Sequence, residues 1–313
     1  MAARPYDPLR WACWQGERLA GNKSPKTIAT INFKGGVGKT TVTWCLADTL
    51  SAYSDANVLM FDLDAQMSLT QAVGLNEDSG SLHAAFESWY EKSVANKRTI
   101  FDAIDQFTKP GAHFDFPVAY DFIYQASKNL HFVPSVEDLY WLELEFFDRE
   151  QMKDFMRRLL GKIAHSGKVA DYDYVLFDCP PSFTLLSYSV LSCCDLVLIP
   201  VNPDFFASRG VSLLLNSLKM RIEPHPTPQI AVFMNKTKTY ANAPTKETAF
   251  YMRQIDQICR RVSTEQGIRA DFLDKAWVRE RVGIKRAITG GGVPPELVTD
   301  FQRLWDACIG VLK

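Results

Sequence analysis

Residues 34–41, which read Lys-Gly-Gly-Val-Gly-Lys-Thr-Thr, are the part of this sequence whose residue types and spacing most clearly predict chemistry. They follow the β-branched run 27–33, and helical spacing begins at Thr40. Glycines between a strand and a helix let backbone N–H groups surround phosphate oxygens, and the helix N-terminus adds partial positive charge. Lys39 would reach the β- and γ-phosphates, and the Thr40 hydroxyl would ligate Mg²⁺. The segment therefore predicts a nucleotide phosphate site, and a chance Gly-rich turn is the alternative.

Strand-like and helix-like segments alternate along the chain and predict the elements that position this loop. The strand candidates are continuous apolar runs, as expected for strands covered on both faces; besides 27–33 they are 57–61, 174–177, 196–201 and 230–234. The helix candidates are 40–52 and segments at about 184–194, 205–220 and 247–263. This order predicts an α/β fold, a mostly parallel twisted sheet with helices on both faces.

The stretch 73–120 fits that alternation poorly. It contains helix-like pieces at 82–96 and 99–107, followed by Pro110-Gly111. We interpret it as an inserted helical segment that covers the fold rather than as part of the sheet. We divide the chain into an N-terminal extension, 1–26, and one phosphate-loop domain, 27–313, which contains this inserted segment.

The composition is that of an ordinary soluble globular protein, with 47% hydrophobic and 23% charged residues. The seven cysteines include no C-x-x-C pair and the five histidines are scattered, so metal-ligand spacing is absent and a reduced, cytoplasmic setting is favoured. No apolar run is long enough to predict a signal peptide or a membrane span. The net charge is −1, from 35 basic and 36 acidic residues, but a total says nothing about how charge is distributed.

One departure from the generic phosphate loop suggests a family. The glycine expected five places before Lys39 is replaced by Lys34, and with this change the chain resembles the ParA/MinD superfamily of deviant Walker A P-loop ATPases from about Thr27 onward. Three further blocks match in order: 58–66 with a D-x-D-x-Q pattern, 173–182 as the Walker B and switch segment, and 198–201 with the following Gly210.

The resemblance implies that the chain binds ATP and Mg²⁺, forms a nucleotide-sandwich homodimer on ATP binding, and hydrolyses ATP weakly on its own. Lys34 would cross the dimer interface to the phosphates of the partner's nucleotide. Lys39 would act with it in catalysis, and Asp64 would position the attacking water. Gly35 matches the place where the partner subunit approaches closely, so a side chain there should block pairing.

The same resemblance implies a nucleotide and metal site. The nucleotide would be held by Gly35, Gly36, Val37, Gly38, Lys39, Thr40, Thr41 and Asn235, the last at the adenine edge. The metal would be held by Thr40, Asp62 and Asp178. An aspartate or asparagine after a strand is also a common cap or turn former, and the phosphate loop favours the functional interpretation. Cys179 and Cys193-Cys194 suit buried thiols better than the iron–sulfur branch of the superfamily.

Two branches of the superfamily differ in what they bind. MinD-like members end in a Lys-rich amphipathic helix that binds membrane, whereas the segment 295–312 has no basic face and is expected to pack on the sheet. ParA-like members bind DNA without sequence preference. The span 219–286 holds 14 Lys and Arg against 7 Asp and Glu, which suits phosphate contacts. Arg279, Arg281, Lys285 and Arg286 lie where the family has DNA-contacting arginines; solvated helix faces are the alternative.

The expected function is that of a cytoplasmic, nucleoid-associated ATPase that dimerises on ATP, binds DNA non-specifically and moves or spaces a cargo. A ParB-like or cargo-adaptor partner would stimulate hydrolysis, with plasmid or chromosome partition as the leading cargo. The alternatives are a protein cargo such as carboxysomes or chemoreceptor clusters, and a membrane- or synthase-associated accessory ATPase. Only about 26 residues precede the phosphate-loop domain, so a helix-turn-helix domain before it is not expected. Trp11 and Trp14 there would pack on the body or dock a partner.

Overall fold

The computed structural model describes residues 25–74, 80–109, 122–142, 152–165, 172–222, 228–281, 293 and 295–312. Within them an eight-stranded sheet has the order β10-β7-β6-β1-β5-β2-β4-β3, and only β3 runs antiparallel to its neighbour. The strands are β1 (Lys26–Thr30), β2 (Val58–Asp62), β3 (Tyr124–Ser127), β4 (Leu130–Val133), β5 (Tyr174–Asp178), β6 (Leu196–Val201), β7 (Gln229–Met234) and β10 (Ala270–Phe272). A separate hairpin joins β8 (Thr239–Tyr240) to β9 (Ala243–Pro244).

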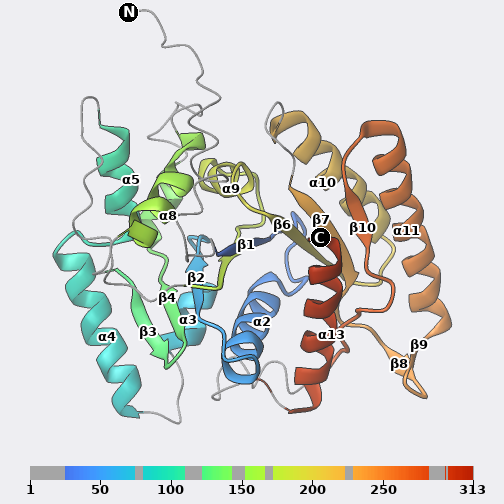
Figure 1. Ribbon diagram of the computed structural model, residues 1–313, viewed down its shortest axis with the longest axis horizontal. Helices are drawn as coiled ribbons and strands as arrows, with labels where there is room; N and C mark the ends of the chain where they lie inside the picture. The colour runs from blue at the N-terminus through green and yellow to red at the C-terminus, as the bar shows by residue number, and fades with distance from the viewer. Residues whose placement is uncertain are drawn as a thin grey trace, which may run out of the picture.

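Helices cover both faces of this sheet (Figure 1). One core lies under α5 (Ile100–Thr108), α8 (Phe155–His165), α9 (Leu185–Leu191), α10 (Ala207–Ile222) and α11 (Lys246–Gln266). The other lies under α2 (Lys39–Tyr53), α3 (Ser68–Gly74), α4 (Gly80–Ala95) and α13 (Pro295–Val311). Along β2 the side chains alternate between the cores, with Leu59 and Phe61 in the first and Val58 and Met60 in the second. This alternation explains why the strand reads as a continuous apolar run.

The predicted α/β fold with a mostly parallel sheet is confirmed, and so are its five predicted strands. Three strands of the eight-stranded sheet were missed, β3, β4 and β10. The sequence of β3 is Tyr-Gln-Ala-Ser, which is short and largely polar because it forms an edge of the sheet. Both β4 and β10 have only three or four residues, too few for a periodic signal.

The stretch 73–120 contributes α4 and α5, at the two places where helices were expected; residues 75–79 and 110–120 lie outside the described part. A Thr99–Asp102 capping box starts α5, and its apolar side, including Ile100 and Ile104, enters the first core. At the end of the chain, α13 buries Leu297, Phe301 and Leu304 against the second core, so its predicted packing on the body is confirmed. No helix in the described ranges has the length and apolar character needed to cross a bilayer.

Candidate phosphate-binding and hydrolysis site

The loop between β1 and α2 forms a concave turn at the carboxyl end of the sheet. Gly36 and Gly38 have φ of +72° and +90°, in the left-handed region that favours glycine. Gly38 is the N-cap of α2, so the first N–H groups of that helix point toward the loop. Asn32 fixes the entry to the loop: its side-chain amide donates to the Pro200 carbonyl at 2.8 Å and its Oδ1 accepts the Lys34 N–H at 2.9 Å.

Two residues after β7 hold the other side of the loop. The Asn235 side-chain amide donates to the Val37 carbonyl at 2.7 Å, and Lys236 Nζ donates to the Gly36 carbonyl at 2.7 Å. A Cβ at Gly38 would lie 2.6 Å from Asn235 Nδ2, so these two residues pack without space between them. Asn235 was expected at the adenine edge, which stays a prediction; the structure gives its amide a contact with the loop. The contact of Lys236 was missed, since one lysine carries no spacing signal.

Lys39, in the first turn of α2, is buried and faces acidic groups. Burial lowers the pKa of its ammonium, while the charges of Asp178 and Asp64 act in the opposite direction. A cation held in a partly desolvated site interacts strongly with anions. Lys39 therefore lies where a phosphate entering the loop would meet it.

Asp178, at the end of β5, is buried with Asp62 as its register partner on β2. Within the described residues neither of its carboxylate oxygens receives a hydrogen bond of ordinary geometry. Burial raises the pKa of Asp178, helped by the charge of Asp62, while the Thr40 hydroxyl and Lys39 act against that rise. Buried polar atoms are normally satisfied, so this carboxylate fits a group that the protein alone does not supply.

That group can be Mg²⁺ with its water shell. Mg²⁺ keeps several waters and takes one or two carboxylates together with substrate phosphates, rather than a cage built from protein alone. No cluster of three metal-ligating His, Cys, Asp or Glu side chains occurs in the described part of the chain, which suits this pattern. The Thr40 hydroxyl and the Asp178 carboxylate are the two groups that fit such an ion.

Asp62 differs from Asp178 because its oxygens are already used. Its Oδ2 accepts the N–H and the hydroxyl of Thr70, both at 2.8 Å, and its Oδ1 accepts the Asp64 N–H at 3.2 Å. Burial raises the pKa of Asp62 to about 6, despite those hydrogen bonds. Its predicted metal role remains a prediction, and its contacts show that it shapes the turn leading to Asp64.

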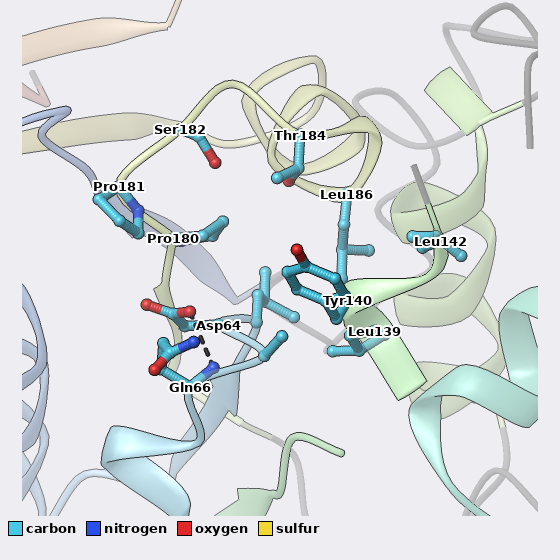
Figure 2. Close-up of a pocket in the computed structure, with 12 residues that line it drawn as sticks. Asp64, Gln66, Leu139, Tyr140, Leu142, Pro180, Pro181, Ser182, Thr184 and Leu186 are labelled. Carbon is cyan, nitrogen blue, oxygen red and sulfur yellow. Dashed lines mark hydrogen bonds between the residues drawn. The ribbon is translucent and has the colours of Figure 1, made fainter. Parts of the chain in front are cut away.

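Asp64 lies at the edge of a pocket of about 400 Å³ (Figure 2). Its Oδ1 accepts the Gln66 N–H at 3.0 Å, and its Oδ2 has no hydrogen-bond partner among the described residues. The pocket is lined by residues of three segments, 63–66, 139–142 and 180–186. Figure 2 shows Asp64 and Gln66 on one side of this space, Tyr140 on another, and Pro180 and Pro181 between the sheet and α9. The geometry thus brings Asp64 beside a space that is open to water.

The Lys34 side chain pairs with a residue outside the phosphate loop. Its ammonium pairs with the carboxylate of Asp204, just before α10, and lies 5.9 Å from the ring centroid of Phe206. Phe206 and its neighbour Phe205 are 64% and 80% exposed, so the lysine stands beside an apolar surface. Asp204 was missed, because it lies three residues beyond the end of β6, whereas Asp62 and Asp178 are the last residues of their strands.

Arg279, one of the predicted DNA contacts, also pairs within the protein, and its role on DNA stays a prediction. The Arg279 guanidinium donates from Nε to Asp300 Oδ2 at 2.9 Å and from Nη2 to the Glu296 carbonyl at 2.9 Å, so it holds α13 in place. Its side chain is 19% exposed, which leaves little of it for another partner. Arg281 is exposed, whereas Lys285 and Arg286 lie outside the described residues.

The cysteines near the site are unreactive in character. Cys179, directly after Asp178, is fully buried, and burial raises its thiol pKa. Cys194 is buried as well, and its pKa is also raised. The interpretation as buried thiols is confirmed for Cys179 and Cys194, whereas Cys193 is partly exposed.

Residues 25–230 match the family AAA_31, described as an AAA domain. A ParA family protein of Chlamydia trachomatis is 30% identical over 208 residues, 64% of this chain and 68% of that protein. The sporulation initiation inhibitor protein Soj of Bacillus subtilis is 30% identical over 195 residues, 62% of this chain and 65% of Soj. An uncharacterised protein of Mycobacterium tuberculosis is 31% identical over 202 residues, 64% of this chain and 54% of that protein. This chain therefore spans about half the length of that last curated relative.

Solved structures share the fold at lower identity. Apo McdA of Cyanothece has a TM-score of 0.67 at 20% identity, over 90% of this chain and 99% of McdA. A plasmid partition protein of Borrelia burgdorferi bound to AMPPNP has a TM-score of 0.65 at 19% identity, over 92% of this chain and 99% of that protein. The ParA of pNOB8 bound to nonspecific DNA has a TM-score of 0.57 at 21% identity, over 92% of this chain and 96% of that ParA. These likenesses show a common architecture across nearly the whole chain.

Proposed function

This chain belongs to the ParA family of P-loop ATPases, and on that premise we propose that it is an ATP-driven dimerising switch that binds DNA and positions a cargo. The observation that carries the proposal is the placement of Lys39 and Thr40 at the start of α2, near the buried Asp178 carboxylate, which receives no hydrogen bond of ordinary geometry within the described residues. A glycine-lined loop at a helix N-terminus suits phosphates, and a buried carboxylate beside a hydroxyl suits the metal that accompanies them.

The hydrolysis site follows from the same geometry. Thr40 and Asp178 would hold Mg²⁺, which when bound neutralises developing charge on the phosphates. Lys39 would contact the β- and γ-phosphates, and Asp64, with one carboxylate oxygen available, would orient the attacking water. ATP and Mg²⁺ are accordingly the cofactors we propose. The plasmid partition protein of Borrelia burgdorferi, which shares the fold, is bound to AMPPNP, and this supports the assignment.

The switch resides in Lys34. In the single chain its ammonium pairs with Asp204. We propose that ATP binding brings two chains together and that Lys34 then reaches the partner's nucleotide, where a second cation stabilises transferred charge. Because this arrangement exists only in the dimer, basal hydrolysis should be weak. The exposed Phe205 and Phe206 beside Lys34 supply apolar surface for that contact.

The ATP-bound dimer would bind nucleoid DNA through the basic region 219–286, with Arg281 as the predicted contact that is exposed in the described part. Phosphate contacts require positive charge and reach but no base recognition, so binding would be independent of sequence. A ParB-like or adaptor protein would stimulate hydrolysis and release the dimer. Plasmid or chromosome partition is the cargo we favour, since Soj and the partition protein of Borrelia are relatives in sequence or fold.

A DNA-binding assay with ATP tests the proposal against the accessory-ATPase alternative. The protein is titrated onto random-sequence duplex with ATP or ADP at roughly 50 and 200 mM salt, since phosphate contacts weaken steeply over that range. We expect binding with ATP that falls with salt, and none with ADP. Lys39→Ala, which should not bind ATP, is the control. ATP hydrolysis without any DNA binding would favour the accessory ATPase and contradict the positioning function.

A further inference from the structure

Ser135, in the turn that follows β4, connects the Asp64 loop to α4 through three hydrogen bonds. Its hydroxyl donates to the Asp64 carbonyl at 2.8 Å, and its N–H donates to the Thr70 hydroxyl oxygen at 2.8 Å. Its own carbonyl accepts the Tyr90 hydroxyl at 3.1 Å. Ser135 is fully buried, so these bonds form out of contact with solvent, where a missing partner is costly.

The network closes on the other side of the same loop. Thr70 bridges Ser135 and Asp62, since its hydroxyl accepts the Ser135 N–H and also donates to Asp62 Oδ2 at 2.8 Å. Asp62 Oδ1 then accepts the Asp64 N–H at 3.2 Å. Asp64 is therefore held at its N–H through Asp62 and at its carbonyl through Ser135. A backbone held on both sides of one residue fixes the point and direction from which its side chain extends.

Tyr90 brings α4 into this network, and its ring is fixed in an aromatic cluster. It stacks on Phe86 at 5.9 Å between centroids, and Phe86 packs against Tyr124 of β3 at 5.2 Å. Burial, with the nearby charges of Glu137 and Asp138, raises the pKa of Tyr90 to about 12. The phenol thus keeps its proton at neutral pH and remains a donor.

We propose that Tyr90 and Ser135 are positioning residues for hydrolysis, which hold Asp64 where it orients the attacking water. The inference rests on the role proposed above for Asp64. It also gives α4, within the stretch 73–120, a specific role, because one side of this helix reaches the hydrolysis site through a single hydroxyl. A purely structural network would instead affect folding and nucleotide binding together.

The sharpest test is Tyr90→Phe, which removes one hydroxyl and leaves the ring in place. Tyr124→Phe is the matched control, because Tyr124 lies in the same cluster but makes no hydrogen bond to Ser135 in the described part of the chain. We expect Tyr90→Phe and Ser135→Ala to lower kcat about tenfold, as small misplacements of catalytic groups do. The KM for ATP and ATP-dependent dimerisation should stay at the wild-type level. Tyr124→Phe should match the wild type.

A second comparison asks whether the effect passes through Asp64. In single-turnover hydrolysis, adding Tyr90→Phe to Asp64→Ala should cause no further loss, because residues acting as one unit are not additive. Thr70→Val should resemble Tyr90→Phe, while Thr70→Ser, which keeps the bridging hydroxyl, should resemble the wild type.

Three results would overturn the proposal. The first is an equal kcat for Tyr90→Phe and Tyr124→Phe. The second is that Tyr90→Phe lowers the hydrolysis rate of Asp64→Ala by the same factor as that of the wild type, and the third is a rise in the KM for ATP that accounts for the whole loss of activity. If the wild type hydrolysed no ATP, the proposed function itself would fail and the positioning role with it, which separates the two failures.

Discussion

Arg279 and Asp300 form an ion pair across the second core, with 2.9 Å between guanidinium Nε and carboxylate Oδ2 and no exposure of the aspartate side chain. The backbone N–H of Arg279 donates to the same oxygen at 3.1 Å, and Arg303 Nη2 donates to Asp300 Oδ1 at 3.2 Å. One buried carboxylate on α13 thereby fixes the segment that follows β10. That segment in turn pairs with Thr237, two residues beyond the Asn235 that contacts the phosphate loop.

Asp300→Asn should destabilise the fold. The change keeps the volume and removes the charge, which leaves two guanidinium groups without their anion. Breaking a buried pair by removing one partner costs about 3 kcal/mol or more in the free energy of unfolding. Asp306→Asn, at an exposed position of the same helix, is the matched control and should change it by less than about 0.5 kcal/mol. Urea unfolding measures both, and equal values would show that the pair contributes no stability.

Lys39→Ala and Lys34→Ala should separate nucleotide binding from dimerisation. Lys39 is buried at the start of α2 near Asp178 and Asp64, so its loss should abolish ATP binding measured by calorimetry. Lys34 pairs with Asp204, so Lys34→Ala should bind ATP and stay monomeric in size-exclusion chromatography with light scattering. Retained ATP affinity in Lys39→Ala would contradict the assignment of residues 34–41 as a phosphate loop. An ATP-dependent dimer of Lys34→Ala would contradict the proposal that Lys34 crosses the dimer interface.

Two glycines of the loop should respond differently to a side chain. At Gly38 the backbone has φ of +90° and a Cβ would lie 2.6 Å from Asn235, so Gly38→Ala should distort the loop and lose ATP binding. At Gly35 a Cβ meets no atom within 4 Å, so Gly35→Val should fold and bind ATP. If the partner subunit approaches Gly35 closely, that variant will nevertheless fail to dimerise. Dimerisation of Gly35→Val would place the interface elsewhere.

The architecture was readable from the sequence because its signals are local. A buried parallel strand is a continuous apolar run, and β1, β2, β5, β6 and β7 all have one. The phosphate loop combines glycines, Lys39 and Thr40 within eight residues, so the strand and helix around it follow directly. The edge strand β3 gives no such signal, because solvent on one side permits polar residues.

The contacts that complete the site are long-range and could not be predicted from the sequence. Ser135 and Asp64 are 71 residues apart, and Asn235 and Val37 are 198 apart. Neither serine nor asparagine in a turn differs, by type or spacing, from any other turn residue. Arg279 shows the converse: it was expected on DNA as part of a charge cluster, and only the three-dimensional structure shows that its guanidinium pairs with Asp300 on α13.

The raised pKa of Asp62 predicts a pH effect on stability. A carboxyl whose folded pKa is about 6, above its unfolded value near 3.8, binds protons more tightly when folded. Its stabilising contribution is complete below about pH 4 and is lost as the pH rises through about 6. The difference in unfolding free energy between wild type and Asp62→Asn should therefore fall over this interval and stay constant above about pH 7. Asparagine adds a constant offset from altered hydrogen bonds with Thr70, so the slope is the readout. A difference independent of pH would show that Asp62 titrates normally.

Charge reversal at Arg281 tests where DNA binds. Arg281 is exposed and follows β10, whereas Lys92 is exposed on α4, which packs near β3 at the opposite edge of the sheet. Both Arg281→Glu and Lys92→Glu change the net charge by the same amount, so non-local electrostatic effects should be similar. If Arg281 contacts a phosphate, its reversal should weaken ATP-dependent DNA binding and lower the slope of log K against log salt by about 1 per contact. Lys92→Glu should leave the slope unchanged, and both variants should keep ATP hydrolysis and dimerisation. Equal weakening by the two reversals would indicate that total charge, rather than the region around Arg281, governs binding.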